Sequence, residues 1–250
     1  MPQSIRAQTA TRAVVFSPLD GVGRAEVVEQ RLSDAIVLGL LGPGERLPSE
    51  SELARQFNVA IVTVRESLES LRDKGLVETR RGRGGGSFVS ARQDADESLL
   101  DGRLAKTSRV ELRDQAVHYA ALAAMAADLA ADRASEDDVQ ALGRLVELAD
   151  TSTDGSARRA ENTFRLEVAA LSQSARLVRE HLRLQAEFGP LLWLNLRTQQ
   201  NRDRNRETHG AIVSAIAEGD GDTARRLTVE QLSDAVEWLI QVKSELESER

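Results

Sequence analysis

The stretch TVRESLESLRDKGLVETRRGRGGGSFV, residues 63–89, joins a helical pattern directly to a glycine-loosened, cationic loop. Apolar residues recur at Val64, Leu68 and Leu71, which is the spacing of one helical face. Gly75 is expected to end this helix, and the segments LVET and SFVS read as two short strands around the turn RRGRGGG. Few folds place a helix directly before a small hairpin with a basic tip, so this pattern limits the possible folds of this part of the chain.

Two further helical patterns precede this stretch. The first places apolar residues four apart, at Val28, Leu32, Ile36 and Leu40. The second begins in LPSESELARQF, where Ser49 and Glu52 have the spacing of a capping box. Three helices followed by a hairpin predict a winged helix-turn-helix domain over residues 24–90.

The remainder of the chain predicts helices alone. Aromatic residues make up only 3% of a chain that is 41% hydrophobic, so the core must be built mainly from Leu, Ala and Val, which suits helices. Residues 1–23 are expected to form a flexible arm and residues 91–107 a patternless linker. Helical segments are expected near 108–133, 135–150, 156–173, 175–196, 198–218 and 221–247, with Pro190 kinking or restarting the fourth. The predicted fold is mainly α: an N-terminal winged helix-turn-helix and an all-α bundle over residues 108–250.

Several classes of protein are disfavoured by what the sequence lacks. It contains no cysteine, which excludes a disulfide framework, a thiolate nucleophile and a zinc finger. The longest apolar run, residues 119–131, is mostly alanine and too short to span a bilayer, and residues 1–23 contain no signal-peptide pattern. We therefore expect a cytoplasmic protein with no membrane partner.

Charge is distributed unevenly along the chain. The net charge is −7, yet residues 72–83 carry a local excess of positive charge. The cations in this stretch are Arg72, Lys74, Arg80, Arg81 and Arg83, against Asp73 and Glu78. A basic patch on an acidic chain is the local footprint expected of a nucleic-acid-binding surface.

The helix-turn-helix pattern indicates which residues meet DNA. The second helix of such a motif enters the major groove, so Thr63 and Arg65 are the groove-facing candidates. Arg80, Arg81 and Arg83 are placed to reach phosphates or a narrow minor groove, and glycines such as Gly82 let the backbone approach closely. The alternative is a solvated cationic loop, with Thr63 and Glu66 forming only a second capping box.

The segments GPGERLPSESELARQF, TVRESLESLRDKGLVETRRG and GGSFV closely resemble the DNA-binding domain of the GntR family of bacterial transcription regulators. This resemblance implies that Thr63 and Arg65 occupy DNA-contacting positions, and that Arg81, Gly82 and Arg83 belong to the wing. It also implies double-stranded DNA as the partner.

The sequence departs from the family pattern at the turn before the recognition helix. Members usually have Ser-Arg or Thr-Arg there, whereas this chain has Ala60 and Ile61, and Ser51 stands where some members place another arginine. A bidentate arginine–guanine contact contributes about 1–3 kcal/mol of discrimination. Base readout is therefore expected to depend more on the wing and on DNA shape.

The second half resembles the FCD effector domain of the FadR-like subgroup. The fragments that carry this resemblance are AADRASEDDVQAL, ENTFRLEVAALSQSARL and THGAIVSAIAEGD. The resemblance implies an all-helical bundle that usually dimerises and binds a small molecule. A homodimer on a palindromic operator is accordingly expected, because two half-sites require two winged domains.

Many members of the subgroup bind a divalent metal through four residues, which correspond here to Glu161, Arg165, His209 and Gln231. A guanidinium has no lone pair to offer, and an amide is a poor ligand for zinc or nickel. No metal cofactor is therefore expected; Glu161 and His209 are the only remaining candidate ligands. Tyr119 stands where members often have an arginine that holds ligand carboxylates.

The resemblance thus implies an effector site formed by Glu161, Arg165, His209, Gln231 and Tyr119, with Arg165 binding the anionic group. Ordinary alternatives exist for these residues. Glu161 and Arg165 are four residues apart, so they could form an exposed ion pair. His209 could be a partly buried histidine that binds no ligand.

The leading functional hypothesis is a ligand-responsive repressor released from its operator by a small organic-acid, acyl or phosphorylated metabolite. One alternative is a constitutive DNA-binding protein with a purely structural bundle. An enzyme is the other alternative, and little favours it: there are three histidines, no cysteine and no nucleophile motif. The GRGGG run lies in a hairpin rather than opening a helix, so it does not predict a nucleotide site.

Overall fold

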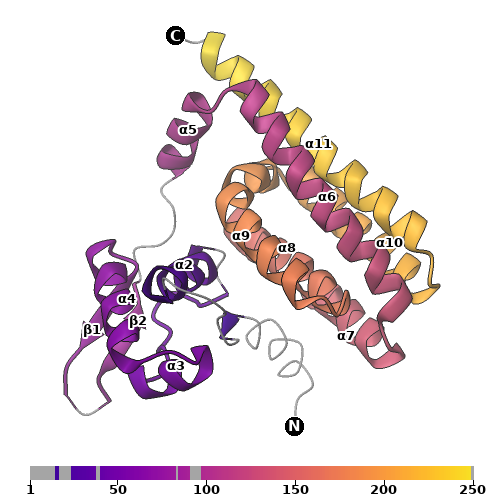
Figure 1. The fold of residues 1–250 in the computed structure, drawn as a ribbon. Helices are drawn as coiled ribbons and strands as arrows, with labels where there is room; N and C mark the ends of the chain where they lie inside the picture. Colours follow the sequence, from indigo (N-terminus) through magenta and orange to yellow (C-terminus); the bar gives the residue numbers. More distant parts are fainter. Residues whose placement is uncertain (1–14, 17–23, 38–39, 83, 91–96, 249–250) are drawn as a thin grey trace. The chain divides into compact units, whose positions relative to one another are not determined.

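The computed structural model describes residues 15–16, 24–37, 40–82, 84–90 and 97–248 (Figure 1). The chain divides into two compact units between residues 96 and 97. The expected arm, apart from residues 15–16, lies outside the described residues, as do Arg83 and residues 91–96 of the expected linker.

The N-terminal unit is a winged helix-turn-helix, as the sequence predicts. Its helices are α2 (Arg24–Val37), α3 (Glu50–Phe57) and α4 (Ile61–Asp73), and its strands β1 (Val77–Arg80) and β2 (Gly86–Val89) pair antiparallel. The predicted capping box is present: the Ser49 hydroxyl accepts from the Glu52 amide, and the Glu52 carboxylate accepts from the Ser49 amide. Asn58, in the left-handed region at φ 54°, ends α3 and turns the chain toward α4.

The predicted apolar faces of these helices meet in one core. The fully or almost fully buried side chains are Val28, Leu32, Ile36, Leu53, Phe57, Val64, Leu68 and Leu71. The hairpin joins this core through Val77 and Val89, which are opposite each other in the ladder. Because the base of the hairpin is anchored in the core, the hairpin holds its tip in a fixed position.

All the regular secondary structure in the described part of the C-terminal unit is helical. Its elements are α5 (Glu97–Lys106), α6 (Arg109–Arg133), α7 (Glu136–Glu147), α8 (Asp154–Leu171), α9 (Ala175–Leu192), the 3-10 helix η1 (Trp193–Arg197), α10 (Gln199–Ala217) and α11 (Gly221–Ser248). The two longest helices, α6 and α11, run side by side along the unit (Figure 1). Helix α9 continues through Pro190 to Leu192 before the chain tightens into η1. No helix in the described part of the chain is long and apolar enough to cross a membrane.

Helix α5 corrects the interpretation of residues 91–107 as a patternless linker. Leu100 and Leu104 of α5 are buried, and Lys243 on α11 donates to the carbonyl of Ala105 at 2.9 Å. Arg197 of η1 pairs with Asp101 at 2.8 Å. The segment is helical because tertiary contacts bury its few apolar residues, and its polar composition hides that pattern in the sequence.

Candidate effector site and DNA-binding surface

The start of α4 is exposed, as expected of a recognition helix. Ile61 is 43% and Val62 58% exposed, so Ile61 does not pack inside the unit. Ala60 is the N-cap residue and makes no side-chain capping bond. Thr63 therefore lies within the first turn of α4, half-buried, and the alternative of a Thr63–Glu66 capping box is wrong.

Arg65 is held at the surface by an acidic partner. Its Nε donates to Glu50 Oε2 at 2.6 Å, and the two side chains are 65% and 41% exposed. An exposed ion pair contributes only about 0–1 kcal/mol, so a phosphate or base edge can compete with Glu50 for the guanidinium. The pair orients Arg65 in the free protein.

The wing needs its glycines. Gly82 and Gly84 have φ of 99° and 91°, values that residues with a side chain rarely adopt. A Cβ on Gly85 would lie 2.5 Å from the carbonyl oxygen of Arg80, so only glycine fits there. The tip of the hairpin therefore requires glycine for steric reasons, in addition to the close approach to DNA that the sequence analysis expects of these residues.

The described arginines of the wing differ in their surroundings. Arg80 lies over the Phe88 ring, 4.4 Å from its centroid, and pairs with Glu78 at 2.7 Å, while the side chain of Arg81 is exposed. Arg46, which the sequence analysis missed, donates to the carbonyl of Gly85 at 2.8 Å. Arg46 also forms an isolated β-bridge with Phe88, next to the buried Leu47, so its segment runs along the wing, a long-range pairing that the local sequence does not display.

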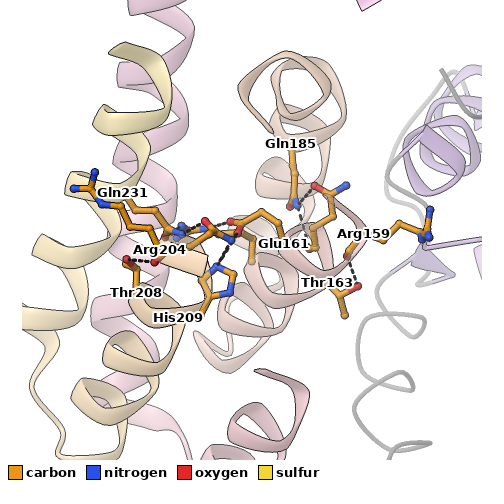
Figure 2. A network of polar contacts seen from close by, with 11 residues as sticks. Arg159, Glu161, Thr163, Gln185, Arg204, Thr208, His209 and Gln231 are labelled. Atoms are coloured by element: carbon orange, nitrogen blue, oxygen red, sulfur yellow. Dashed lines mark hydrogen bonds and ion pairs between the residues drawn. The ribbon is translucent and has the colours of Figure 1, made fainter. Parts of the chain in front are cut away.

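Glu161 lies at the centre of a polar network in the helical unit. Its Oε1 accepts from Arg165 Nε at 2.7 Å, one turn along α8. Its Oε2 accepts from Asn205 Nδ2 at 2.6 Å and lies 2.7 Å from His209 Nε2. Figure 2 shows His209 and Gln231 pointing toward Glu161 from α10 and α11.

Gln231 closes the network into a ring. Its amide oxygen accepts from Arg165 Nη2, and its amide nitrogen donates to Asn205 Oδ1. Glu161, Arg165, His209 and Gln231 are between 0% and 9% exposed. The structure thus brings together four of the five expected effector-site residues, and the alternative of an exposed Glu161–Arg165 ion pair is wrong. Asn205 was missed, although it stands one turn before His209 on α10.

The charges around Glu161 keep it ionised. Burial alone would raise the pKa of this carboxyl group, but the positive charges of His209 and Arg165, with hydrogen bonds from His209 and Asn205, hold it well below its usual range. The His209 ring also stacks on Phe164, with centroids 3.8 Å apart. The network therefore has a buried negative charge that faces the guanidinium of Arg165 and the ring of His209.

The donor set does not fit a divalent cation. Both Glu161 oxygens face N–H groups of Arg165, Asn205 and His209, and the Nε2 of His209 faces Glu161. Arg165, a permanent cation, lies 2.7 Å from Glu161, so it would repel a divalent cation bound to the same carboxylate. Within the described residues, no group of three His, Cys, Asp or Glu side chains is arranged to hold a metal.

Tyr119, the fifth expected residue, lies beside the network and does not join it. Its ring centroid is 5.1 Å from that of His181, and its hydroxyl makes no hydrogen bond among the described residues. Burial raises the pKa of Tyr119, with the Arg165 charge opposing, so its hydroxyl stays protonated. Burial likewise lowers the pKa of His181 to about 3, and the Arg165 charge acts in the same direction. Both groups are neutral at pH 7.

A groove of about 340 Å³ reaches the network from the surface. It lies between α10 and α11, and its lining includes Asn205 and Gln231, the outer members of the ring. Arg204 and Asp234 also line it and pair with each other at 2.7 Å. The groove is in the size range of small-molecule sites.

An exposed recognition helix, a glycine-dependent wing and a separate helical unit with a polar centre define a DNA-binding transcription regulator. Comparison with known proteins agrees. Residues 24–86 match the family of bacterial regulatory proteins called gntR, and residues 116–234 match the FCD domain. The chain belongs to the GntR family, whose members are transcription regulators and not enzymes.

Relatives extend over most of the chain. An HTH-type transcriptional regulator named RmpR from Mycobacterium gastri is 36% identical over 240 residues, which cover 94% of this chain and 87% of that protein. The HTH-type transcriptional repressor NanR from Klebsiella aerogenes is 30% identical over 230 residues, covering 84% and 82%. The solved structure of E. coli McbR/YncC is similar in fold, with a TM-score of 0.53 and 21% identity over 88% of this chain and 99% of that one.

Proposed function

We propose that the protein is a ligand-responsive repressor whose helical unit binds a small anionic metabolite and thereby releases DNA. The observation that carries this proposal is the largely buried polar network of Glu161, Arg165, Asn205, His209 and Gln231. A closed polar ring within a helical unit costs more to bury than apolar packing, which supports a role beyond folding. The name of the NanR relative, a repressor, supports the direction of control.

Arg165 is the proposed anion-binding residue. Two of its guanidinium nitrogens face Glu161 and Gln231, and the Gln231 partner is a neutral amide. A carboxylate or phosphate makes a stronger, charge-assisted bond than an amide oxygen does, so an anion can displace Gln231 from Arg165. Gln231 and Asn205 also line the groove, so a ligand entering there meets them before it reaches Arg165.

The same arrangement supports an effector site that uses no metal. Arg165 supplies the positive charge that a divalent cation would otherwise supply, and Glu161 orients it from the preceding turn. His209, which stacks on Phe164, is a second donor for the anion when its hydrogen bond is divided between Glu161 and the ligand. An effector that binds one arrangement of the ring better than another shifts the population of that state.

We further propose a homodimer on a palindromic operator, since paired half-sites call for paired winged domains. A row of exposed apolar residues on α6 supports contact between two copies: Val110 and Val117 are 77% and 70% exposed, and Met125 46%. Spacings of seven and eight residues place the three on one face of the helix.

Operator release tests this function. A labelled DNA fragment selected by the protein is bound, and the small-molecule fraction of a cell extract is added while fluorescence anisotropy is followed. Release is expected for the wild type. Arg165→Met, made together with Glu161→Gln so that no buried charge loses its partner, is expected to bind the DNA but resist release. Equal release of both proteins contradicts the role of Arg165, and no release from either favours the constitutive alternative.

A further inference from the structure

The turn before α4 and the first residues of this helix present an apolar surface to solvent. Ala60, Ile61 and Val62 are all exposed, Ile61 by 43% and Val62 by 58%. The core of the unit takes other residues of the same helix, such as Val64 and Leu68, which are almost completely buried. Apolar residues scattered singly over a surface are ordinary, but a contiguous group of them indicates a binding surface.

This apolar surface lies at the end of α4 that the motif brings to DNA. Helix α4 is the second helix of the helix-turn-helix, and Ile61 is its first residue. In that motif the N-terminal residues of the second helix reach base edges in the major groove. Membership of the GntR family makes DNA the partner of this domain. The apolar surface is therefore continuous with the surface that binds DNA.

Neighbouring charges distinguish Ile61 from Val62. Ile61 stands four residues before Arg65 and shares its helix face, and the exposed guanidinium of Arg65 is paired with Glu50 at the surface. Val62 stands four residues before Glu66, an exposed carboxylate that the phosphates of DNA repel. A duplex that approaches Arg65 therefore meets Ile61, while Val62 is turned toward the acid.

An isoleucine side chain has no donor or acceptor with which to read a base. The major-groove edges of the bases carry donors and acceptors, and the one large apolar group among them is the C5-methyl group of thymine. A polar base edge placed against Ile61 would lose its water without gaining a hydrogen bond, which is unfavourable. The chemistry of this position thus favours thymine over the other bases.

We propose that Ile61 is a specificity-determining residue, which packs against the methyl group of a thymine in the bound DNA. Removing one methyl-sized group from water raises affinity about fourfold. This discrimination is weaker than that of a bidentate arginine–guanine contact, so it leaves a large share of recognition to the wing and to DNA shape. The contact needs no effector, so it is independent of the proposed release from DNA.

Deoxyuridine tests the contact in the full-length protein, because it differs from thymidine in its base only by the missing methyl group. A duplex is selected from random DNA by the wild-type protein, and each thymine is then replaced in turn by deoxyuridine. Affinities are measured by fluorescence anisotropy without effector. At one or more positions the replacement is expected to weaken binding about fourfold.

Three variants assign the effect to a side chain. Ile61→Ala should bind the thymine and deoxyuridine duplexes equally at that position, whereas Ile61→Val should keep most of the preference. Val62→Ala is the matched control, since it shortens an exposed apolar residue of the same turn, and it should keep the fourfold difference. Because both positions are exposed, the melting temperatures of the variants should stay near the wild-type value.

Several results would overturn the contact. The selected duplex could contain no thymine whose methyl group matters, Ile61→Ala could keep the fourfold difference, or Val62→Ala could lose it. A contact between copies of the chain is the other use of an apolar surface, and Ile61→Asp tests it. This variant should bind the selected duplex weakly and sediment as the wild type does. A change in its oligomeric state would assign the surface to self-association.

Discussion

Arg165 Nε donates to Glu161 Oε1 at 2.7 Å within a single turn of α8, and neither side chain is more than 2% exposed. Two consequences follow from this pair. Each charge depends on the other, because removing one partner leaves an uncompensated charge in the core. The guanidinium is also fixed in place before any ligand arrives, which reduces the entropy lost on binding.

Glu161→Gln should strongly destabilise the helical unit. The substitution keeps the shape of the side chain but leaves the buried Arg165 charge without its counter-charge, and the expected loss is about 3–5 kcal/mol in the free energy of unfolding. Urea denaturation followed by circular dichroism measures it. The double variant Glu161→Gln, Arg165→Met is the control, and it should recover much of the loss. A single variant as stable as the wild type would show that the pair is not energetically coupled.

Stability should fall as the pH drops below about 6.5, and His181 should be one cause. In the folded chain the pKa of His181 is lowered to about 3, whereas an unfolded histidine titrates near about 6.5. The unfolded state therefore takes up the proton first, so the contribution is present above about pH 6.5 and is lost progressively as the pH falls toward 3. The limiting slope for one proton is about 1.4 kcal/mol per pH unit.

Unfolding midpoints between pH 7 and 4.5 test this assignment. His181→Leu should flatten the slope between those values, while His118→Gln, at an exposed position, should leave it unchanged. The assignment is wrong if the two variants respond alike.

DNA binding should depend steeply on salt through the wing. Replacing both Arg81 and Arg83 with Ala should weaken binding to all sequences and reduce the slope of log affinity against log salt by about 2. Arg225→Ala, which removes an exposed arginine of the helical unit, serves as the control and should keep the wild-type slope. An unchanged slope in the folded double variant would reject the wing as a phosphate-contacting element.

Most of the fold could be predicted from local patterns. The Ser49–Glu52 capping box, the glycine at position 75 and the spacing of Val64, Leu68 and Leu71 act within a few residues of one another, so the sequence displays them directly. Helix α5 escaped prediction because its stability comes from residues far along the chain, Arg197 and Lys243 among them. A short polar helix of this kind carries little signal of its own.

The site was predicted in part, by aligning positions with a family. That alignment supplied Glu161, Arg165, His209 and Gln231, which the structure joins into one network. It did not supply Asn205, because an asparagine on a helix has many ordinary roles. It also gave no hint that His181, Gln185 and Trp193 are buried. Packing between helices decides which face of each helix turns inward, and the sequence of an almost all-helical unit does not show this directly.

The helical unit should form a dimer by itself. A fragment comprising residues 97–250 keeps α5 and the core that it helps to bury, and it should sediment as a dimer at tens of micromolar. In the full-length protein, Val117→Asp should yield monomers if the exposed row on α6 is the interface. Leu148→Asp changes a residue of similar exposure outside α6 and should leave the dimer intact. A monodisperse monomer of the 97–250 fragment beside a dimeric full-length protein would place the contact between copies elsewhere, and a monomeric full-length protein would contradict the dimer.

The central claim is that the Arg165 guanidinium takes the place of a divalent cation at the effector site. Elemental analysis of protein purified without chelators tests it most directly. The wild type should carry clearly less than one transition-metal ion per chain, whereas Arg165→His combined with Gln231→His, which restores nitrogen ligands beside Glu161 and His209, should bind close to one zinc ion per chain. Stoichiometric zinc, nickel or manganese in the wild type that disappears in His209→Gln would contradict the account.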